Sequence, residues 1–266
     1  RETLDSIERL WDQPDERRMG SASLPPQVRS ASVELRDVSF AYPGANTASL
    51  SNINLTIRPG EWIAIIGRVA AGKSTLGRVI SGLFEPSSGA MLVDGIDSKQ
   101  YRPHDLRREF RFVAQDSNLF SGSIKDNLSL ASSRASEEQL IAALRKVGAD
   151  RYLSRDAGGF DRVVGEGGRQ LSGGQRNFLA LARAFVAPSK LLFLDEPSGA
   201  MDAQTERLFI QCLSQNLTTD QTLIVSTHRP ALFQLCERVI VIDGGRIAAD
   251  GPKDEVIRNV GMRTDG

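Results

Sequence analysis

Apolar and polar residues alternate along two stretches in the first quarter of the chain. Val33–Phe40 and Ser49–Ile57 alternate with a period of two, and the turn sequence Tyr42-Pro43-Gly44 lies between them. This pattern predicts two antiparallel strands that each bury one face. Near the other end, Asp243-Gly244-Gly245-Arg246 predicts a tight hairpin turn.

Several later stretches are continuously apolar, which is typical of strands buried on both faces. They are Trp62–Ile66, Leu191–Leu194, Leu223–Val225 and Val239–Ile242. Helical spacing follows two of these runs, at Ala203–Leu217 and Pro230–Leu235. Alternating strands and helices form parallel sheets, so we expect an α/β fold with a largely parallel, helix-covered sheet.

Strand patterns almost disappear between Asp116 and Ala187. The segments Glu137–Val147 and Gln175–Val186 have helical spacing instead. We therefore expect a helical subdomain at about residues 116–187, inserted into the α/β body.

The first 32 residues differ from the rest of the chain. Residues 12–32 contain three prolines and a glycine, which predicts a linker, and the chain begins with Arg1 rather than methionine, as expected of a piece of a longer protein. The apolar residues before this linker recur at the spacing of an amphipathic helix: Leu4, Ile7, Leu10 and Trp11.

Composition excludes several classes of protein. The 266 residues include 33 basic and 33 acidic side chains, so no net positive field exists to hold nucleic acid. No apolar run approaches the roughly 20 residues that span a bilayer. Cys212, Cys236, His104 and His228 are the only cysteines and histidines, which argues against a zinc site and favours two buried thiols.

The segment Gly67-Arg68-Val69-Ala70-Ala71-Gly72-Lys73-Ser74 fits the phosphate-binding pattern G-x-x-x-x-G-K-[ST], between a predicted strand and a predicted helix. Backbone N–H groups of such a loop surround phosphates, Lys73 neutralises their charge, and the Ser74 hydroxyl is a ligand for Mg²⁺. We assign these eight residues and the adjacent Thr75 to a nucleoside triphosphate.

Two carboxylates, Asp195 and Glu196, directly follow the apolar run Leu191–Leu194. At the end of a buried strand, Asp195 would lie at the sheet edge where Mg²⁺ is held beside the phosphate loop. Glu196 lies beside it, and successive side chains point in different directions, so we expect the two acids to have different roles.

Leu171-Ser172-Gly173-Gly174-Gln175 directly precedes the helical stretch Arg176–Val186 and predicts a second anion-binding helix N-terminus. With these two phosphate-binding elements, the sequence resembles the nucleotide-binding domain of the ATP-binding cassette (ABC) superfamily over about Val33–Val256. In that family this pentapeptide is the signature motif, which serves the ATP held by the opposite subunit.

The resemblance implies roles for single residues elsewhere in the chain. Tyr42 is similar to the aromatic residue that stacks on adenine, and Gln115 to the glutamine that senses Mg²⁺ and the attacking water. Glu196 is similar to the general base and His228 to the histidine that contacts the γ-phosphate. The segment Ser198-Gly199-Ala200-Met201-Asp202 resembles the loop that crosses the dimer interface.

These assignments imply an ATPase that uses ATP and Mg²⁺. The implied catalytic residues are Glu196, His228, Gln115 and Lys73, and the implied magnesium ligands are Ser74, Gln115 and Asp195.

Three positions depart from the family pattern. Val69-Ala70-Ala71 replaces a common serine and glycine, Gly199 replaces a frequent serine, and Asn177 replaces a common glutamine. We expect weaker binding of ATP but an active enzyme, because the base, the magnesium ligands and the histidine are retained.

Val164-Gly165-Glu166-Gly167-Gly168 resembles the loop through which exporters contact their membrane domain, with Glu166 as the coupling residue. Residues 1–32 resemble the passage from a last transmembrane helix into the ATPase; a helix docked on the domain itself is the alternative. Gly67-Arg68, Ala200-Met201-Asp202 and the segment 244–254 look most like type I secretion exporters of unfolded proteins or peptides.

A lipid or small-molecule exporter is the alternative to a protein exporter. ABC ATPases of DNA repair or translation fit less well, because this chain has one uninterrupted cassette and no basic stripe.

The exporter resemblance implies three regions: 1–32 from an upstream transmembrane domain, 33–258 as the ABC domain and 259–266 as a C-terminal tail. It implies a head-to-tail homodimer around two ATP, attached to the transmembrane domain of the same chain at the cytoplasmic face of the bacterial inner membrane. A periplasmic adaptor and an outer-membrane channel are the further partners that type I secretion implies, and nucleic acid is not expected.

Overall fold

The computed structural model describes residues 31–115, 118–153, 158–199, 201–218 and 220–260. The expected N-terminal helix and most of its linker, Ala200 and most of the C-terminal tail lie outside the described residues. The three-region division of the chain therefore stays a prediction.

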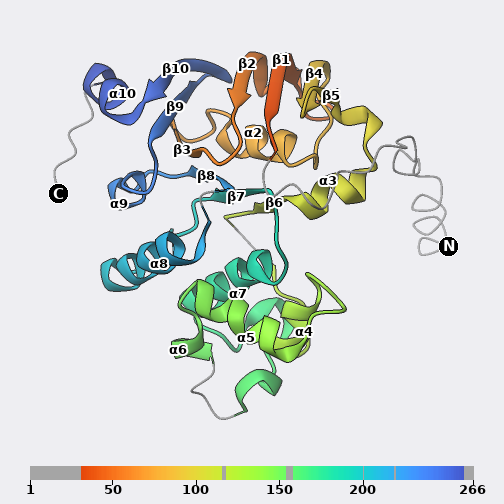
Figure 1. Cartoon of the computed structure of the whole chain (residues 1–266), viewed down its shortest axis with the longest axis vertical. Helices are drawn as coiled ribbons and strands as arrows, with labels where there is room; N and C mark the ends of the chain where they lie inside the picture. Colours follow the sequence, from red (N-terminus) through yellow and green to blue (C-terminus); the bar gives the residue numbers. More distant parts are fainter. Residues whose placement is uncertain (1–30, 116–117, 154–157, 200, 219, 261–266) are drawn as a thin grey trace.

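A four-stranded antiparallel sheet opens the described part of the chain, with the strand order β2-β1-β4-β5 (Figure 1). Pairing of Val33 with Ile57 confirms the antiparallel strands expected from the alternating pattern. The third strand was not predicted, because only its last residues alternate between buried and half-buried positions. The strands are β1 (Val33–Phe40), β2 (Leu50–Ile57), β4 (Ser88–Val93) and β5 (Ile96–Asp97).

A six-stranded mixed sheet forms the centre of the fold, in the order β10-β9-β3-β8-β7-β6. Five strands are parallel and only β10 runs antiparallel, as the predicted hairpin at Asp243-Gly244-Gly245-Arg246 requires. The expected apolar runs all lie in this sheet. Its strands are β3 (Trp62–Ile66), β6 (Phe110–Val113), β7 (Leu191–Asp195), β8 (Thr222–Ser226), β9 (Arg238–Asp243) and β10 (Arg246–Pro252).

Helices cover both faces of this sheet, and α4 to α7 lie together away from the antiparallel strands (Figure 1). The signature helix begins at Gly173, three residues earlier than expected, because Ser172 caps it. The helices are α2 (Lys73–Ile80), α3 (Pro103–Glu109), α4 (Ile124–Ser129), α5 (Glu137–Lys146), α6 (Asp150–Leu153), α7 (Gly173–Phe185), α8 (Ala203–Asn216), α9 (Pro230–Phe233) and α10 (Lys253–Val260). Single 3₁₀ turns lie at Ser98–Gln100, Gly159–Asp161 and Glu166–Gly168.

Alternate residues of the central strands enter two different cores. Leu191 and Phe193 pack with α2 and the antiparallel sheet, whereas Leu192 and Leu194 pack with α4, α5, α7 and α8. Because successive side chains of a strand point to opposite faces, each β7 residue contributes to only one layer. Both faces of β7 are therefore buried, which explains its continuously apolar sequence.

The parallel register brings the carboxyl ends of four strands to one edge of the sheet. Ile65 pairs with Ser226, Ser226 with Asp195, and Leu194 with Val113. The chain leaves these strands at the phosphate loop, His228, Glu196 and Gln115. Residues separated by more than 100 positions therefore share one edge, the usual place of ligands in open α/β sheets.

Candidate functional site

The phosphate loop joins β3 to α2, and its two glycines are required by close backbone approach. A Cβ atom on Gly67 would lie 2.1 Å from the carbonyl oxygen of Ile242, and one on Gly72 would lie 2.8 Å from that of Ser49. Gly72 also has φ 107° and directly precedes α2. Side chains at either position would displace the loop from its neighbours.

The hairpin turn between β9 and β10 is hydrogen-bonded to this loop. The Gly245 N–H donates to the Ala71 carbonyl at 3.0 Å, and the Gly245 carbonyl accepts from the Ser51 N–H at 2.8 Å. Ala70 has φ 63° in the left-handed region, and Val69 is 88% exposed. The departures in this loop therefore add backbone strain and an exposed apolar side chain.

Lys73 is the first residue of α2 and is buried. Its Nζ donates to the carbonyl oxygens of Gly67 at 2.8 Å and Arg68 at 3.1 Å, so it curls back over the loop. Burial lowers the pKa of the Lys73 ammonium, and the negative charges of Glu196 and Asp195 oppose that shift. A buried cation at this position can neutralise phosphate charge, which is the role that the sequence predicts for Lys73.

Unsatisfied polar atoms gather where β7 and β8 end. Among the described residues, five buried side-chain N or O atoms have no hydrogen-bond partner, and three of them belong to Asp195, Ser226 and Glu196, whose Oε1 has only an ion-pair contact with His228. Asp195 pairs with Ser226 across the strands, and the Glu196 N–H donates to the Ser226 carbonyl at 2.8 Å. Buried polar atoms without partners are costly, so this cluster indicates missing ligands.

His228 lies between Lys73 and Glu196. Its Nε2 is 3.2 Å from Lys73 Nζ and 3.3 Å from Glu196 Oε1. A neutral Nε2 can accept from the lysine or donate to the carboxylate, but not both. Nε2 therefore serves one of these two groups at a time, and the tautomer of the imidazole decides which.

Glu196 has φ 46°, which is rare for a residue with a side chain. Strain of this kind persists at functional sites when the surrounding structure imposes it. Here the bond from its N–H to Ser226 and the approach of the His228 N–H to Oε2, at 3.4 Å, fix the residue from both sides.

Tyr42 lies beside the loop and is half-buried. Its hydroxyl is 3.1 Å from Thr75 Oγ1 and accepts from Arg78 Nη1 at 3.0 Å, and its ring packs edge-on against Phe40 and Phe84. The structure therefore places Tyr42 against Thr75, and the adenine-stacking role of Tyr42 stays a prediction. Arg78 was not predicted, although a basic residue one and a half turns after Lys73 could have indicated it.

Gln115 is exposed and follows β6 by two residues, next to the end of β7. Ser172 lies at the start of α7, on the other side of the central sheet from α2 and the antiparallel strands (Figure 1). The structure therefore separates the signature from the phosphate loop within one chain.

The signature segment is built as a helix cap. The Gln175 N–H donates to Ser172 Oγ at 3.2 Å, and the Ser172 N–H donates to Gln175 Oε1 at 3.0 Å. Leu171 is buried, whereas Ser172 and Gly173 are exposed, and Gly174 and Gln175 are partly exposed. An exposed capped N-terminus presents its hydroxyl and the positive end of the helix dipole to solvent.

The loop after Glu196 is tied to three other elements. Asn177 Nδ2 donates to the Pro197 carbonyl at 2.5 Å, so the substituted asparagine of α7 holds the loop. Ser198 Oγ donates to Glu206 at 2.5 Å, and Arg229 Nη2 donates to the Gly199 carbonyl at 3.4 Å.

The loop ends at Asp202, which caps α8. The Thr205 N–H donates to the Asp202 carboxylate, and this hydrogen bond lowers the pKa of Asp202. Met201, the residue before the cap, is buried.

Glu166 is exposed and begins a 3₁₀ turn after Gly165. Ahead of this turn, Val163 pairs with Ser123, next to α4. The predicted coupling residue is thus on the surface of the α4–α7 group, apart from the phosphate loop.

The residues present fit Mg²⁺ and a nucleoside triphosphate. Ser74 and the partnerless Asp195 oxygen offer oxygen ligands of the kind that Mg²⁺ prefers, and Lys73 with the backbone N–H groups of the loop offers donors for phosphates. Ser226 was missed by sequence reasoning, although a hydroxyl at the end of a buried apolar run carries the same signal as Asp195.

Comparisons with known proteins agree with this geometry. The model of the family described as ABC transporter matches residues 50–199. The ATP-dependent lipid A-core flippase of Chromobacterium violaceum is 35% identical over 97% of this chain and 44% of its own length. The alpha-hemolysin translocation ATP-binding protein HlyB of Escherichia coli O157:H7 is 37% identical over 95% of this chain and 36% of its own.

A solved structure, described as a bacterial Atm1-family ABC exporter with ATP bound, superposes with a TM-score of 0.87 at 29% identity. It covers 99% of this chain, which spans 45% of that one. The chain therefore spans less than half the length of these similar proteins. None of the helices in the described ranges is both long and apolar enough to cross a bilayer.

Proposed function

Because the chain belongs to the ABC transporter family, as an ATPase domain of exporter type, we propose that it powers the export of unfolded proteins or peptides. In this proposal two copies pair head to tail around two ATP. The partnerless oxygens at the ends of β7 and β8 support the nucleotide site of this proposal most directly, because they offer buried ligands for a cation beside the phosphate loop.

Bound Mg·ATP would supply the transferable phosphoryl group and the metal charge that offsets its negative oxygens. Ser74, Asp195 and Gln115 would hold the metal, and Lys73 would leave the carbonyl oxygens of the loop for phosphate. Tyr42 would stack on the base. A π face accepts any base, so the nucleotide would be selected mainly through its phosphates.

Departure of Lys73 frees His228 Nε2 to donate toward Glu196 or toward phosphate. Glu196 would then orient the attacking water and accept its proton, and a second chain would provide Ser172 and its helix N-terminus for the same nucleotide. The loop 198–202 would lie at the interface between the copies.

The rest of the exporter follows from the same proposal. Glu166 would contact a transmembrane domain of the same chain, at the cytoplasmic face of the bacterial inner membrane. A periplasmic adaptor and an outer-membrane channel would receive the substrate if secretion is of type I.

Export of a lipid is the second candidate. The lipid A-core flippase and HlyB match this chain at 35% and 37% identity, so the ATPase domain supports both substrates almost equally. ATPase assays of the complete protein in lipid nanodiscs separate them. Stimulation by an unfolded polypeptide but not by lipid A supports the first proposal, and the reverse result replaces it with the second.

Glu196→Gln is the sharpest test of the ATPase mechanism. We expect it to lower the hydrolysis rate by about 10² to 10⁴ while Mg·ATP still binds, because the phosphate loop is unchanged. The variant should accumulate as an ATP-bound dimer in size-exclusion chromatography. Asp195→Asn, the matched variant, should need more Mg²⁺ and form little dimer.

Phosphate release measured beside the chromatography separates the two roles. Hydrolysis by Glu196→Gln at nearly the normal rate would contradict its role as the base. Dimer formation by Asp195→Asn but not by Glu196→Gln would show that the two roles are exchanged.

A further inference from the structure

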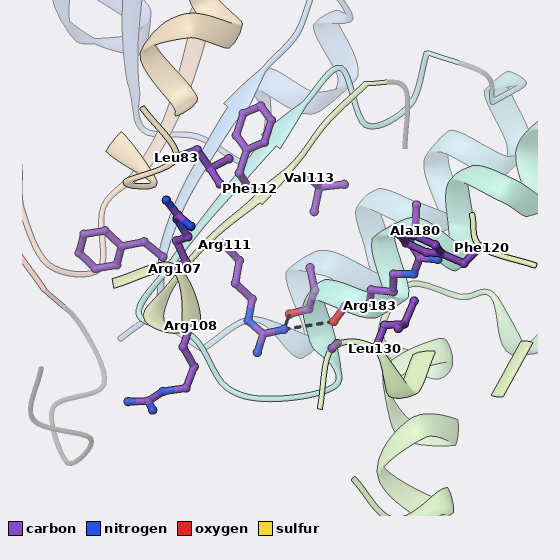
Figure 2. A pocket seen from close by; sticks show the side chains of 13 residues that line it. Leu83, Arg107, Arg108, Arg111, Phe112, Val113, Phe120, Leu130, Ala180 and Arg183 are labelled. Atoms are coloured by element: carbon purple, nitrogen blue, oxygen red, sulfur yellow. Dashed lines mark hydrogen bonds between the residues drawn. The ribbon is translucent and has the colours of Figure 1, made fainter. Parts of the chain in front are cut away.

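Arg183 lies near the end of α7 and reaches back to the segment that follows Gln115. Its Nη1 donates to the Asn118 carbonyl at 2.8 Å and its Nε to the Asn127 carbonyl at 3.0 Å, and Nη2 donates to Asn127 Oδ1. Its guanidinium carbon lies 5.6 Å from the centre of the Phe120 ring (Figure 2). One side chain therefore contacts both ends of the segment 118–127.

Asn127 closes this segment on itself and is fully buried. Its Nδ2 donates to the carbonyl oxygens of Phe120 at 2.9 Å and Ser123 at 3.0 Å, and its Oδ1 accepts from the Phe120 N–H at 3.0 Å. With Arg183 as the fourth partner, both donors and both acceptor positions of the amide are used. Segment 118–127 is thus closed on itself, and Arg183 adds three hydrogen bonds to its apolar packing against α7.

Arg183 is held by directed hydrogen bonds to neutral groups rather than by an ion pair. No carboxylate of the described residues forms a salt bridge with Arg183, and burial without an acid lowers the pKa of its guanidinium. Carbonyl oxygens and the Asn127 amide hold it instead. A planar fork with three directed bonds fixes orientation, which a flexible ammonium cannot do.

Arg183 joins segment 118–127 to α7, and each of these two elements lies close in sequence to a predicted ATP-site residue. Asn118 follows Gln115 by three positions. Arg183 follows Gly173, the first residue of α7, by ten positions, or about 15 Å along a straight helix. Asn177, between them, also holds Pro197 beside Glu196. A shift of segment 118–127 would therefore move α7 and its capped N-terminus.

We propose that Arg183 is a positioning residue that locks segment 118–127 onto α7, so that Gln115 of one ATP site and Ser172 of the other site keep a fixed spacing. This inference rests on the proposed function, in which Ser172 serves the ATP of a second chain. Loss of the lock should leave each chain able to bind ATP but impair closure of the dimer.

Arg183→Lys tests the lock in the 266-residue chain, because it keeps the charge and the stem but not the fork. Arg111→Gln is the matched control. Arg111 Nη1 donates to the carbonyl oxygens of Arg183 and Ala184 at 3.1 and 3.5 Å (Figure 2), so it contacts the same end of α7 without contacting segment 118–127. Asn127→Ala removes the other half of the lock.

Three quantities are measured for each variant: the Kd of Mg·ATP for the dilute chain, the maximal ATPase rate, and the protein concentration that gives half of that rate. For Arg183→Lys we expect a rate about tenfold lower and a half-maximal concentration about tenfold higher, with Kd within about twofold of the original. Arg111→Gln should change all three by less than about twofold. The Arg183→Lys, Asn127→Ala double variant should be no worse than the worse single variant.

Normal kinetics for Arg183→Lys overturn the inference, as does an equal loss in Arg111→Gln. A parallel loss of ATP binding assigns Arg183 a merely structural role and also overturns it. If Arg183→Lys does not fold, Asn127→Ala is read by the same criteria. A chain whose activity is independent of concentration, and whose Glu196→Gln variant stays monomeric, would contradict the proposed function itself.

Discussion

At the scale of the residue, two of the five described non-glycine residues with positive φ lie where the chemistry is proposed. Glu196 holds a left-handed backbone with a full side chain, and Ala70 does the same in the phosphate loop. The conformation costs roughly 1–2 kcal/mol at each position. Glu196 directly follows Asp195, whose buried Oδ1 has no hydrogen-bond partner, so the surrounding structure must hold the Glu196 backbone in place.

A matched pair of variants measures the strain at Glu196. Glu196→Gly should have a free energy of unfolding about 1 kcal/mol larger than Glu196→Ala, because relief of the left-handed strain exceeds the extra chain entropy of glycine. Urea unfolding of both proteins without nucleotide gives the difference. Equal stabilities would mean that the backbone relaxes once the carboxylate is gone.

The two cysteines also differ at this scale, although both were expected to be buried. Cys236 is 1% exposed and burial raises its pKa to about 12, whereas Cys212 is half-buried. At pH 8 we expect a thiol reagent to modify Cys212 first and Cys236 only after unfolding, because the thiolate is the reactive form. Ellman titration of a Cys212→Ala variant checks this.

The raised pKa of Cys236 also makes the free energy of unfolding depend on pH. An unfolded Cys236 ionises near pH 9 and the folded one near 12, so the unfolded chain loses its proton first. Stability from this thiol is therefore complete below about pH 9 and decreases as the pH rises toward 12. Rapid labelling of Cys236 in the folded Cys212→Ala protein at pH 8 would contradict its burial.

At the scale of the element, the packing of α2 on the central sheet depends on Gly77, which has no side chain. A Cβ on Gly77 would lie 2.5 Å from two atoms of the Phe193 ring and 2.8 Å from Phe112. Only glycine lets the helix that follows the phosphate loop pack this closely on β6 and β7. The distance between Lys73 and the ends of those strands depends on that packing.

Gly77→Ala should therefore destabilise the protein by about 1–3 kcal/mol, although alanine favours helices by about 1 kcal/mol over glycine. Urea unfolding measures the loss. In a Phe193→Leu background the same substitution should cost less, because the contact that it violates has been reduced. An increase in stability on Gly77→Ala alone would show that α2 moves away without cost.

At the scale of the whole molecule, the two predicted phosphate-binding elements of one chain lie on opposite sides of the central sheet. The phosphate loop lies with α2, while Ser172 begins α7 on the other side of the central sheet. The proposed head-to-tail pairing of two copies would use both elements at one nucleotide.

Mixing two inactive chains tests this pairing. A Lys73→Ala chain keeps its signature and a Ser172→Arg chain keeps its phosphate loop, so their heterodimer has one competent site. We expect each variant alone to be nearly inactive and the mixture to regain about a quarter of the normal activity at equal concentrations, since half of the dimers are mixed. ATPase rates across mixing ratios reveal this, and a mixture no more active than its parts would contradict head-to-tail pairing.

Much of the fold could be predicted because its signals are local. Runs such as Leu191–Leu194 are apolar over their whole length, and the glycines of the phosphate loop have a fixed spacing. Strand β4 and helix α4 were not predicted, because β4 alternates only in part and α4 is six residues long. Arg183 has no local signal that separates it from other polar residues, because the residues it bonds lie 56 and 65 positions away. Ser226 ends a buried apolar run, but only the pairing of β7 with β8 places it beside Asp195.

The sequence by itself determined which side chains are available to hold phosphate or to ligate Mg²⁺ in the proposed site, and where most of the buried strands lie. Those properties depend on residue type and spacing along a few turns of chain. Only the tertiary structure decided which groups meet, including Lys73 with His228 and Arg183 with Asn118. Such meetings depend on strand register and helix packing, which sum many weak contacts between distant segments.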